Sequence, residues 1–218
     1  MVDIAAQLGA VSRELRIEEV DGEPSNVQVL EQTYHSPIDD VWDAVTSAER
    51  IPRWFMPISG ELRHGGRYQL EGNAGGEVLE CEPPADGAAR FKITWGFGGG
   101  ISWVTVRLTG KGDDTTLELE HVARVADIPD EMWQTYGPGA TGVGWDSGLL
   151  GLATYLSADG SGITPDQAEA WMVSDEGKQF ARGSADAWAA THVAVGADPE
   201  AAARAADATW GFFTGSGQ

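Results

Sequence analysis

The sequence has little cysteine and no long apolar run, and each shortage excludes a class of protein. Cys81 is the only cysteine, so no disulfide can form within the chain, and a reducing compartment is the simplest fit. No stretch of about eighteen apolar residues is present, so no segment is predicted to span a membrane. Residues 1–17 carry charges and lack the apolar core of a secretory signal. These features predict a cytoplasmic protein.

Cations are also scarce. Lys and Arg number 14 against 34 Asp and Glu, which gives the 218 residues a net charge of −20. A surface this acidic repels nucleic acid and anionic lipid headgroups. We therefore expect neither nucleic acid nor a membrane as a partner.

Recognisable metal and cofactor motifs are missing as well. No two of the four histidines (His35, His64, His121 and His192) stand at metal-ligand spacing on a helix, and no cysteine pair supports them. Residues 137–142 have the spacing G-x-G-x-x-G, but a dinucleotide site needs a preceding strand and a parallel βαβ unit. We predict no metal and no cofactor. We interpret the glycines as a hinge that lets Met132, Trp133 and Tyr136 act as a lid over a cavity.

Three regions differ in their patterns of residues. Residues 1–25 form a short lead, residues 26–156 alternate strand and helix signals, and residues 157–218 are rich in alanine and helical in pattern. The composition of residues 157–162 predicts a loop between the last two regions. With 42% hydrophobic residues and nine tryptophans, the chain is predicted to be globular with a large aromatic content in its core.

The middle region predicts an antiparallel sheet followed by one long helix. Turn residues separate the expected strands, which are 27–34, 60–62, 67–71, 76–82, 90–96, 102–109 and 115–123. A helix after Ser36-Pro37 is expected to bury Trp42, and a helix over 143–156 is expected to cross the concave face of the sheet. Capping signals in the last region predict helices near 165–173, 175–195 and 199–213. The fold class is therefore α+β.

Five short motifs, in this order, resemble those of the START-like (SRPBCC, helix-grip) superfamily. They are Tyr34-His35-Ser36-Pro37 with the helix behind it, Gly65-Gly66-Arg67-Tyr68, Gly76-Glu77-Val78 with Pro83-Pro84, Trp95, and Gly144-Trp145-Asp146. The most similar branch is the bacterial family of homologues of the activator of the heat-shock protein 90 ATPase, also labelled polyketide cyclase-like. The resemblance covers residues 27–156. It implies seven antiparallel strands around a long C-terminal helix, with an elongated cavity between them.

Eight residues near the expected cavity are the candidate ligand-binding set. They are Trp54, Tyr68, Trp95, Trp103, His121, Trp133, Tyr136 and Trp145. Aromatic side chains with polar tips suit a cavity for flat, apolar ligands, although the same residues also fill ordinary cores. His121 shares a strand face with Leu117 and Leu119, so it either faces the cavity or is a hydrogen-bonded histidine of the sheet. Cys81 is expected to be a buried, unreactive thiol.

Three functions remain open because the superfamily carries several. The first is binding of a small hydrophobic molecule, aromatic or polyketide-like. The second is an enzyme, a cyclase, dehydratase or hydrolase, with an acid–base pair drawn from His121, Tyr68, Tyr136 or Glu77. The third is a chaperone-associated role. The aromatic residues of the C-terminal extension predict that it packs on its own domain or forms a homodimer interface.

Overall fold

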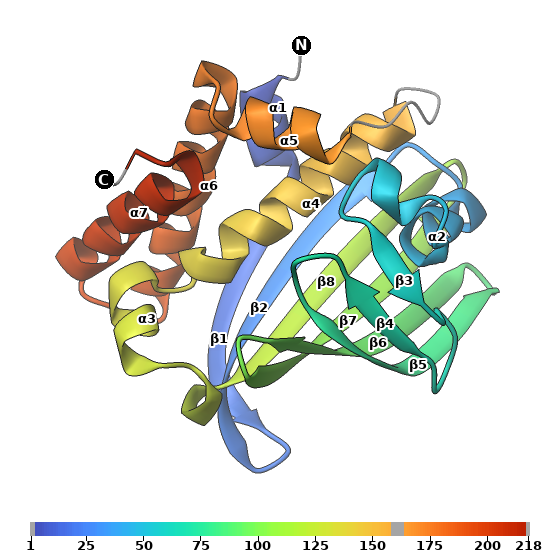
Figure 1. Cartoon of the computed structure of the whole chain (residues 1–218), viewed down its shortest axis with the longest axis horizontal. Helices are drawn as coiled ribbons and strands as arrows, with labels where there is room; N and C mark the ends of the chain where they lie inside the picture. The colour runs from blue at the N-terminus through green and yellow to red at the C-terminus, as the bar shows by residue number, and fades with distance from the viewer. Residues whose placement is uncertain (1–2, 158–163, 217–218) are drawn as a thin grey trace.

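The computed structural model describes residues 3–157 and 164–216. A curved antiparallel sheet of eight strands, in the order β1-β2-β8-β7-β6-β5-β4-β3, supports helices on its concave side (Figure 1). The strands are β1 (Ser12–Val20), β2 (Glu23–Tyr34), β3 (Ile58–Gly60), β4 (Arg67–Leu70), β5 (Gly75–Ala85), β6 (Ala88–Phe97), β7 (Gly100–Lys111) and β8 (Asp114–Arg124). The helices are α1 (Ile4–Ala10), α2 (Ile38–Thr46), α3 (Asp130–Tyr136), α4 (Gly139–Ser157), α5 (Pro165–Met172), α6 (Asp175–Ala194) and α7 (Pro199–Thr214), with 3-10 turns η1 (Ile51–Arg53) and η2 (Val125–Asp127).

The sheet has one strand more than the seven that the family resemblance implies. Residues of the expected lead form β1, which pairs with β2 from Ser12 opposite Glu31 to Val20 opposite Glu23. The strand was not predicted because Leu15 is the only buried residue of β1, so the alternation of apolar residues is weak. Residues 12–20 therefore belong to the sheet.

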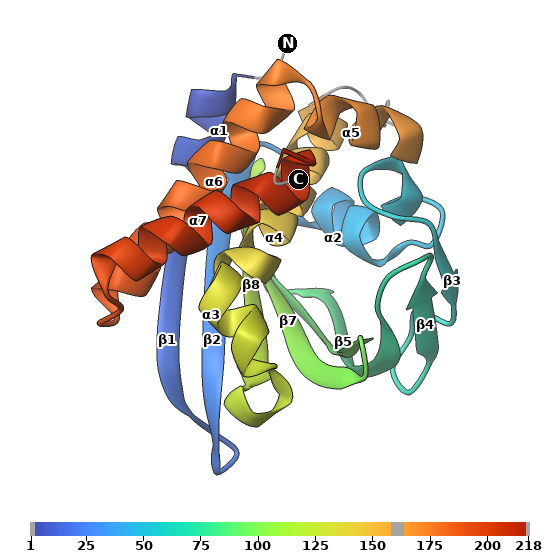
Figure 2. The same cartoon turned by 60° about the vertical axis from the view of Figure 1, so that its left-hand side comes forward.

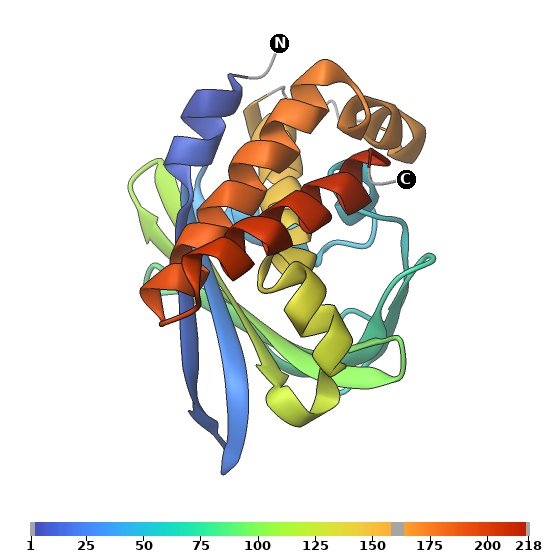
Figure 3. The same ribbon diagram turned by 90° about the vertical axis from the view of Figure 1, so that its left-hand side faces the viewer.

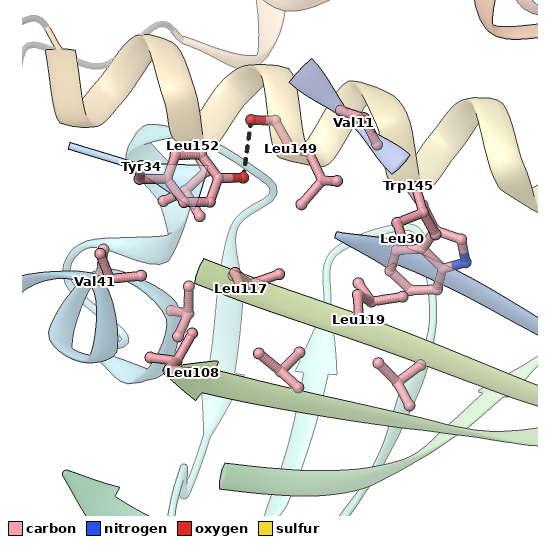
Figure 4. Close-up of a cluster of buried hydrophobic side chains, with 14 of the residues drawn as sticks. Val11, Leu30, Tyr34, Val41, Leu108, Leu117, Leu119, Trp145, Leu149 and Leu152 are labelled. Carbon is pink, nitrogen blue, oxygen red and sulfur yellow. Dashed lines mark hydrogen bonds between the residues drawn. The ribbon is translucent and has the colours of Figure 1, made fainter. Parts of the chain in front are cut away.

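Helix α4 crosses the concave face of the sheet, as predicted, but begins at Gly139 instead of near 143. Figure 4 shows Trp145, Leu149 and Leu152 pointing from α4 towards Leu117 and Leu119 on β8. On the same face the hydroxyl of Tyr34 donates a hydrogen bond to the carbonyl oxygen of Leu149. The main hydrophobic core is thus sandwiched between α4 and the sheet.

The C-terminal helices match their predicted ranges to within one residue at each end. Side-chain oxygens of Thr164, Ser174 and Asp198 accept backbone N–H groups at the three N-termini, which accounts for where the helices start. Helices α6 and α7 lie side by side and cover α4 (Figures 2 and 3). The expected loop over 157–162 falls almost wholly outside the described residues.

The C-terminal extension packs on the same chain. Helix α6 contacts both α4 and β1, and its Trp188 is fully buried within the main core. Phe180, also on α6, is buried with Ile4 of α1 and Leu150 of α4. The extension therefore contributes to the core between α4 and the sheet. None of the helices in the described ranges is both long enough and apolar enough to cross a membrane.

Candidate functional site

An apolar cavity of about 130 Å³ lies between α4 and the sheet. We call it the inner cavity. Trp145, Leu149 and Leu152 of α4 form one wall, and apolar residues of β4 to β8 form the opposite wall. Trp54, just after η1, closes one side, and its indole N–H donates to the carbonyl oxygen of Ala44 on α2 at 2.9 Å. This bond fixes the orientation of the ring.

Four of the predicted site residues line the inner cavity: Trp54, Tyr68, Trp95 and Trp145. Trp95 and Trp145 meet edge to face, with ring centroids 4.9 Å apart. The hydroxyl of Tyr68 donates to the carbonyl oxygen of Thr94 at 2.8 Å, and burial raises its pKa above the ordinary value. Cys81 also lines this cavity and is half-buried, so it is more accessible than the sequence suggested.

A second cavity, of about 190 Å³, lies beyond the Trp95–Trp145 pair. We call it the outer cavity. It is enclosed by β2, β8, the β6–β7 hairpin and the segment from η2 to the start of α4. His121 and Trp133 line it, and Trp95 lines both cavities. Its wall also carries the polar side chains of Asn26, Gln28, Ser102 and Thr141, so it differs chemically from the inner cavity.

The hydrogen bonds of His121 determine its tautomer. The indole N–H of Trp145, which can only donate, lies 3.2 Å from Nδ1 of His121. Nδ1 is therefore the acceptor, and Nε2 carries the proton and donates to Oγ of Ser102 at 2.8 Å. Ser102 in turn donates to the carbonyl oxygen of Trp95 at 3.2 Å. Complete burial lowers the pKa of His121 to about 4, so the ring is neutral at pH 7.

This arrangement does not support acid–base or nucleophilic chemistry at His121. A histidine that activates a serine must accept the hydroxyl proton, whereas here Nε2–H donates to Ser102. The other acid–base candidates lie elsewhere: Tyr68 is bonded to Thr94 in the inner cavity, Tyr136 lies outside both cavities, and Glu77 is exposed on β5 opposite Arg67. No two of these four residues lie together as an acid–base pair.

Two predicted site residues, Trp103 and Tyr136, line neither cavity. Trp103 is on the face of β7 opposite to that of Val104, and its ring stacks under the guanidinium of Arg124, 4.8 Å away. Tyr136 packs against Phe212 of α7 with ring centroids 5.7 Å apart. Both rings are therefore directed away from any ligand in the two cavities. Trp42, expected in the core, packs against the main hydrophobic cluster beside Phe91.

The glycine-rich segment 137–142 has a packing role that the hinge interpretation missed. Gly137 adopts φ = +55° and turns the chain between α3 and α4, and Gly142 lies inside α4 directly against the ring of Trp188. Trp133 on α3 is in edge contact with His192 of α6, with centroids 5.4 Å apart.

Within the residues that the structure describes, no group of three or more His, Cys, Asp or Glu is placed to hold a metal ion.

Comparisons with known proteins agree with this architecture. The sequence profile described as "Activator of Hsp90 ATPase homolog 1-like protein" matches residues 35–157, more than half of the chain. The chain belongs to this family. No curated protein sequence gives a significant match.

The family relationship extends to solved structures. The crystal structure of CalU16 from Micromonospora echinospora is 32% identical, with a TM-score of 0.64 over 86% of this chain and 99% of CalU16. Its solution structure gives 34% identity and a TM-score of 0.66 over 86% and 97% of the two chains. Protein MLL2253 from Mesorhizobium loti, at 22% identity and a TM-score of 0.52 over 61% and 97%, shares the fold. Because the CalU16 match covers much more than residues 35–157, parts of the flanking segments also have counterparts in CalU16.

Sequence reasoning missed Asn26 and Gln28. Both lie on the face of β2 that carries Leu30 and Tyr34 into the core. Alternation along the strand, extended backwards from Tyr34, would have placed these two amides inside the fold. The expected strand began at residue 27, which left Asn26 out of that pattern.

Proposed function

We propose that this protein binds a small apolar aromatic molecule in the inner cavity. The observation that supports the proposal is the cavity itself, which lies in the middle of the core and is lined almost entirely by apolar side chains. Apolar residues that enclose a space instead of filling it lose packing contacts, so an apolar occupant would restore them.

The size of the cavity indicates the size of the ligand. An engineered apolar cavity of about 150 Å³ in another protein admits benzene. At about 130 Å³, the inner cavity matches one aromatic ring. A fused-ring or polyketide-like ligand would need the Trp95–Trp145 pair to separate, because these two rings stand between the inner and outer cavities.

Binding fits the site better than catalysis does. Polar groups at the inner cavity are few, and the hydroxyl of Tyr68 is already bonded to Thr94. The neutral His121 uses both ring nitrogens within the protein. A cyclase, dehydratase or hydrolase needs two titratable groups that converge on one substrate, and the candidate residues do not converge.

Cys81 provides a direct test, because it is the only cysteine in the sequence and it lines the inner cavity. Its rate of modification by a thiol reagent is measured with and without toluene, which is one ring in size. We expect toluene to slow the modification several-fold in a saturable way, since an occupied cavity excludes the reagent. Benzoate, which would bring an unpaired charge into an apolar space, should leave the rate unchanged.

A matched pair of variants separates binding in the cavity from binding elsewhere. Ile93→Phe adds bulk to the cavity wall and should abolish protection by toluene. Ile17→Phe makes the same change on β1, where Ile17 is 55% exposed and lines neither cavity, and should leave protection intact. Equal protection in the two variants, or none in the unmodified protein, would contradict the proposal.

A further inference from the structure

The side-chain amide of Asn26 lies on the wall of the outer cavity. Asn26 is 7% exposed as a residue, and within residues 3–157 and 164–216 its amide forms no side-chain hydrogen bond and is not among the fully buried unpaired polar groups, so it opens onto the cavity. An amide that faces a cavity without a protein partner bonds to water or to a ligand there. The amide offers one acceptor oxygen and two donor hydrogens.

The neighbouring polar groups are already paired with one another. Gln28 donates to the carbonyl oxygen of Pro138 at 2.8 Å and accepts a hydrogen bond from the hydroxyl of Thr141. His121 and Ser102 bond to each other. These bonds occupy the neighbouring side chains and leave the amide of Asn26 as the neutral group that can bond to a ligand.

The charge of the outer cavity favours a neutral ligand. No lysine or arginine lines it, and the one carboxylate in its lining, Asp127, is exposed at the surface. His121 stays neutral because burial lowers its pKa to about 4. An anion would find no counter-ion here, and burying an unpaired charge is strongly unfavourable.

Beside its polar side chains, the outer cavity has flat apolar walls. The rings of Trp95 and Trp133 and the flexible side chain of Met132 line it, and such groups suit a planar molecule. Three large apolar residues of its lining are partly exposed to solvent: Phe97 is 61% exposed, Ile101 53% and Met132 46%. Three large apolar side chains that stay partly in water at one cavity form an apolar route into it.

We propose that the outer cavity binds a planar neutral molecule carrying a carboxamide or lactam group, which pairs with the side chain of Asn26. The ligand carbonyl would accept from Nδ2 of Asn26 and the ligand N–H would donate to Oδ1, while its ring lies against the indole walls. This site is distinct from the inner cavity, and the inference goes beyond the proposed function without depending on it.

Benzamide is the probe, with ethylbenzene and benzoate as its apolar and anionic analogues. Binding is followed by the side-chain amide signals of Asn26 and Gln28 in NMR spectra of the full chain. We expect benzamide to shift the Asn26 signals in a saturable way and to bind at least about ten-fold more tightly than either analogue, since a site built around a hydrogen bond rejects molecules that lack it.

Asn26→Leu removes the amide at similar volume, and Asn26→Ala removes it without adding bulk. Both variants should weaken benzamide binding about ten-fold or more, measured by calorimetry. They should remain folded, because the amide that they remove has no hydrogen bond to the described residues to lose. Asn73→Leu, the same change in the turn between β4 and β5 and outside both cavities, should bind benzamide as the unmodified protein does.

The outcomes separate this inference from the proposed function. If benzamide leaves the Asn26 signals unmoved, or binds both Asn26 variants as tightly as the unmodified protein, the outer cavity is a water-filled pocket only and the inference is wrong. Protection of Cys81 by toluene is measured in the same samples. If that protection persists while benzamide fails, the proposed function stands alone, and the reverse result leaves only the outer site.

Discussion

The indole N–H of Trp188 donates to a carboxylate oxygen of Asp146 at 3.0 Å, which joins α6 to α4 in the buried centre of the molecule. The hydroxyl of Ser184 donates to the same carboxylate. From the other side, Arg13 of β1 forms an ion pair with Asp146 at 2.8 Å. One buried carboxylate therefore ties together the first strand, the central helix and the C-terminal extension.

Asp146→Asn should destabilise the protein strongly. The side chains of Arg13 and Asp146 are only 7% and 1% exposed, so neutralising the carboxylate leaves a buried guanidinium without its counter-charge. Removing one partner of a buried ion pair typically costs about 3–5 kcal/mol. We expect a loss of that size in the free energy of unfolding, measured by urea denaturation at pH 7.

Asp207→Asn is the matched control, because it removes an exposed carboxylate from its 2.8 Å ion pair with Arg182. Exposed pairs contribute about 0–1 kcal/mol, so this variant should unfold almost as the unmodified protein does. If the two variants lost equal stability, Asp146 would not be the link between the extension and the core.

His121 predicts a pH-dependent stability. Its pKa is about 4 in the folded protein against an ordinary value of 6.5, so between these values the unfolded chain binds a proton that the folded protein does not. Stability must therefore fall as the pH drops from 6.5 towards 4, by about 1.4 kcal/mol for each unit of pKa difference. At pH 4.5 the loss from this group approaches about 2.5 kcal/mol.

The contribution of His121 is isolated by comparing the unmodified protein with His121→Gln in urea at pH 7.5 and 4.5. Glutamine is neutral at both values and can still accept from Trp145 and donate to Ser102. Carboxylates titrate equally in both proteins, so the unmodified protein should lose about 2.5 kcal/mol more than the variant between the two pH values. Parallel losses would show that His121 is not held neutral by burial.

Most of the fold was predictable because its signals are local. Capping residues at Thr164, Ser174 and Asp198 set the starts of three helices, and turn residues separated the strands of the meander. The family motifs then gave the helix-grip arrangement, which the profile match and CalU16 support. Strand β1 escaped prediction because its inward face carries Arg13, whose burial depends on Asp146, 133 residues away.

The site was less predictable because residue type does not determine the direction of a side chain. Trp95 and Trp103 are both strand tryptophans. Trp95 lies opposite Ser102 in the pairing of β6 with β7 and faces the cavities, whereas Trp103, the next residue after Ser102 on β7, points to the other face of the sheet. Alternation of Val104, Val106 and Leu108 along β7 would have excluded Trp103 from the cavity. The division into two cavities depends on the Trp95–Trp145 contact between β6 and α4, which no local pattern contains.

Two glycines of α4 should respond in opposite directions to the same substitution. A methyl group at Gly142 would overlap the indole of Trp188, which is fully buried and held by Asp146, so neither the ring nor the helix can move away easily. Gly142→Ala should therefore lower the free energy of unfolding by about 1–3 kcal/mol, the usual cost of overpacking. At Gly144 a methyl group would meet nothing within 4 Å, and alanine favours a helix interior by about 1 kcal/mol over glycine, so Gly144→Ala should raise it. Urea unfolding of the two variants, two residues apart on one helix, compares the signs directly. Stabilisation by Gly142→Ala would mean that α6 does not lie against α4 as closely as this structure requires.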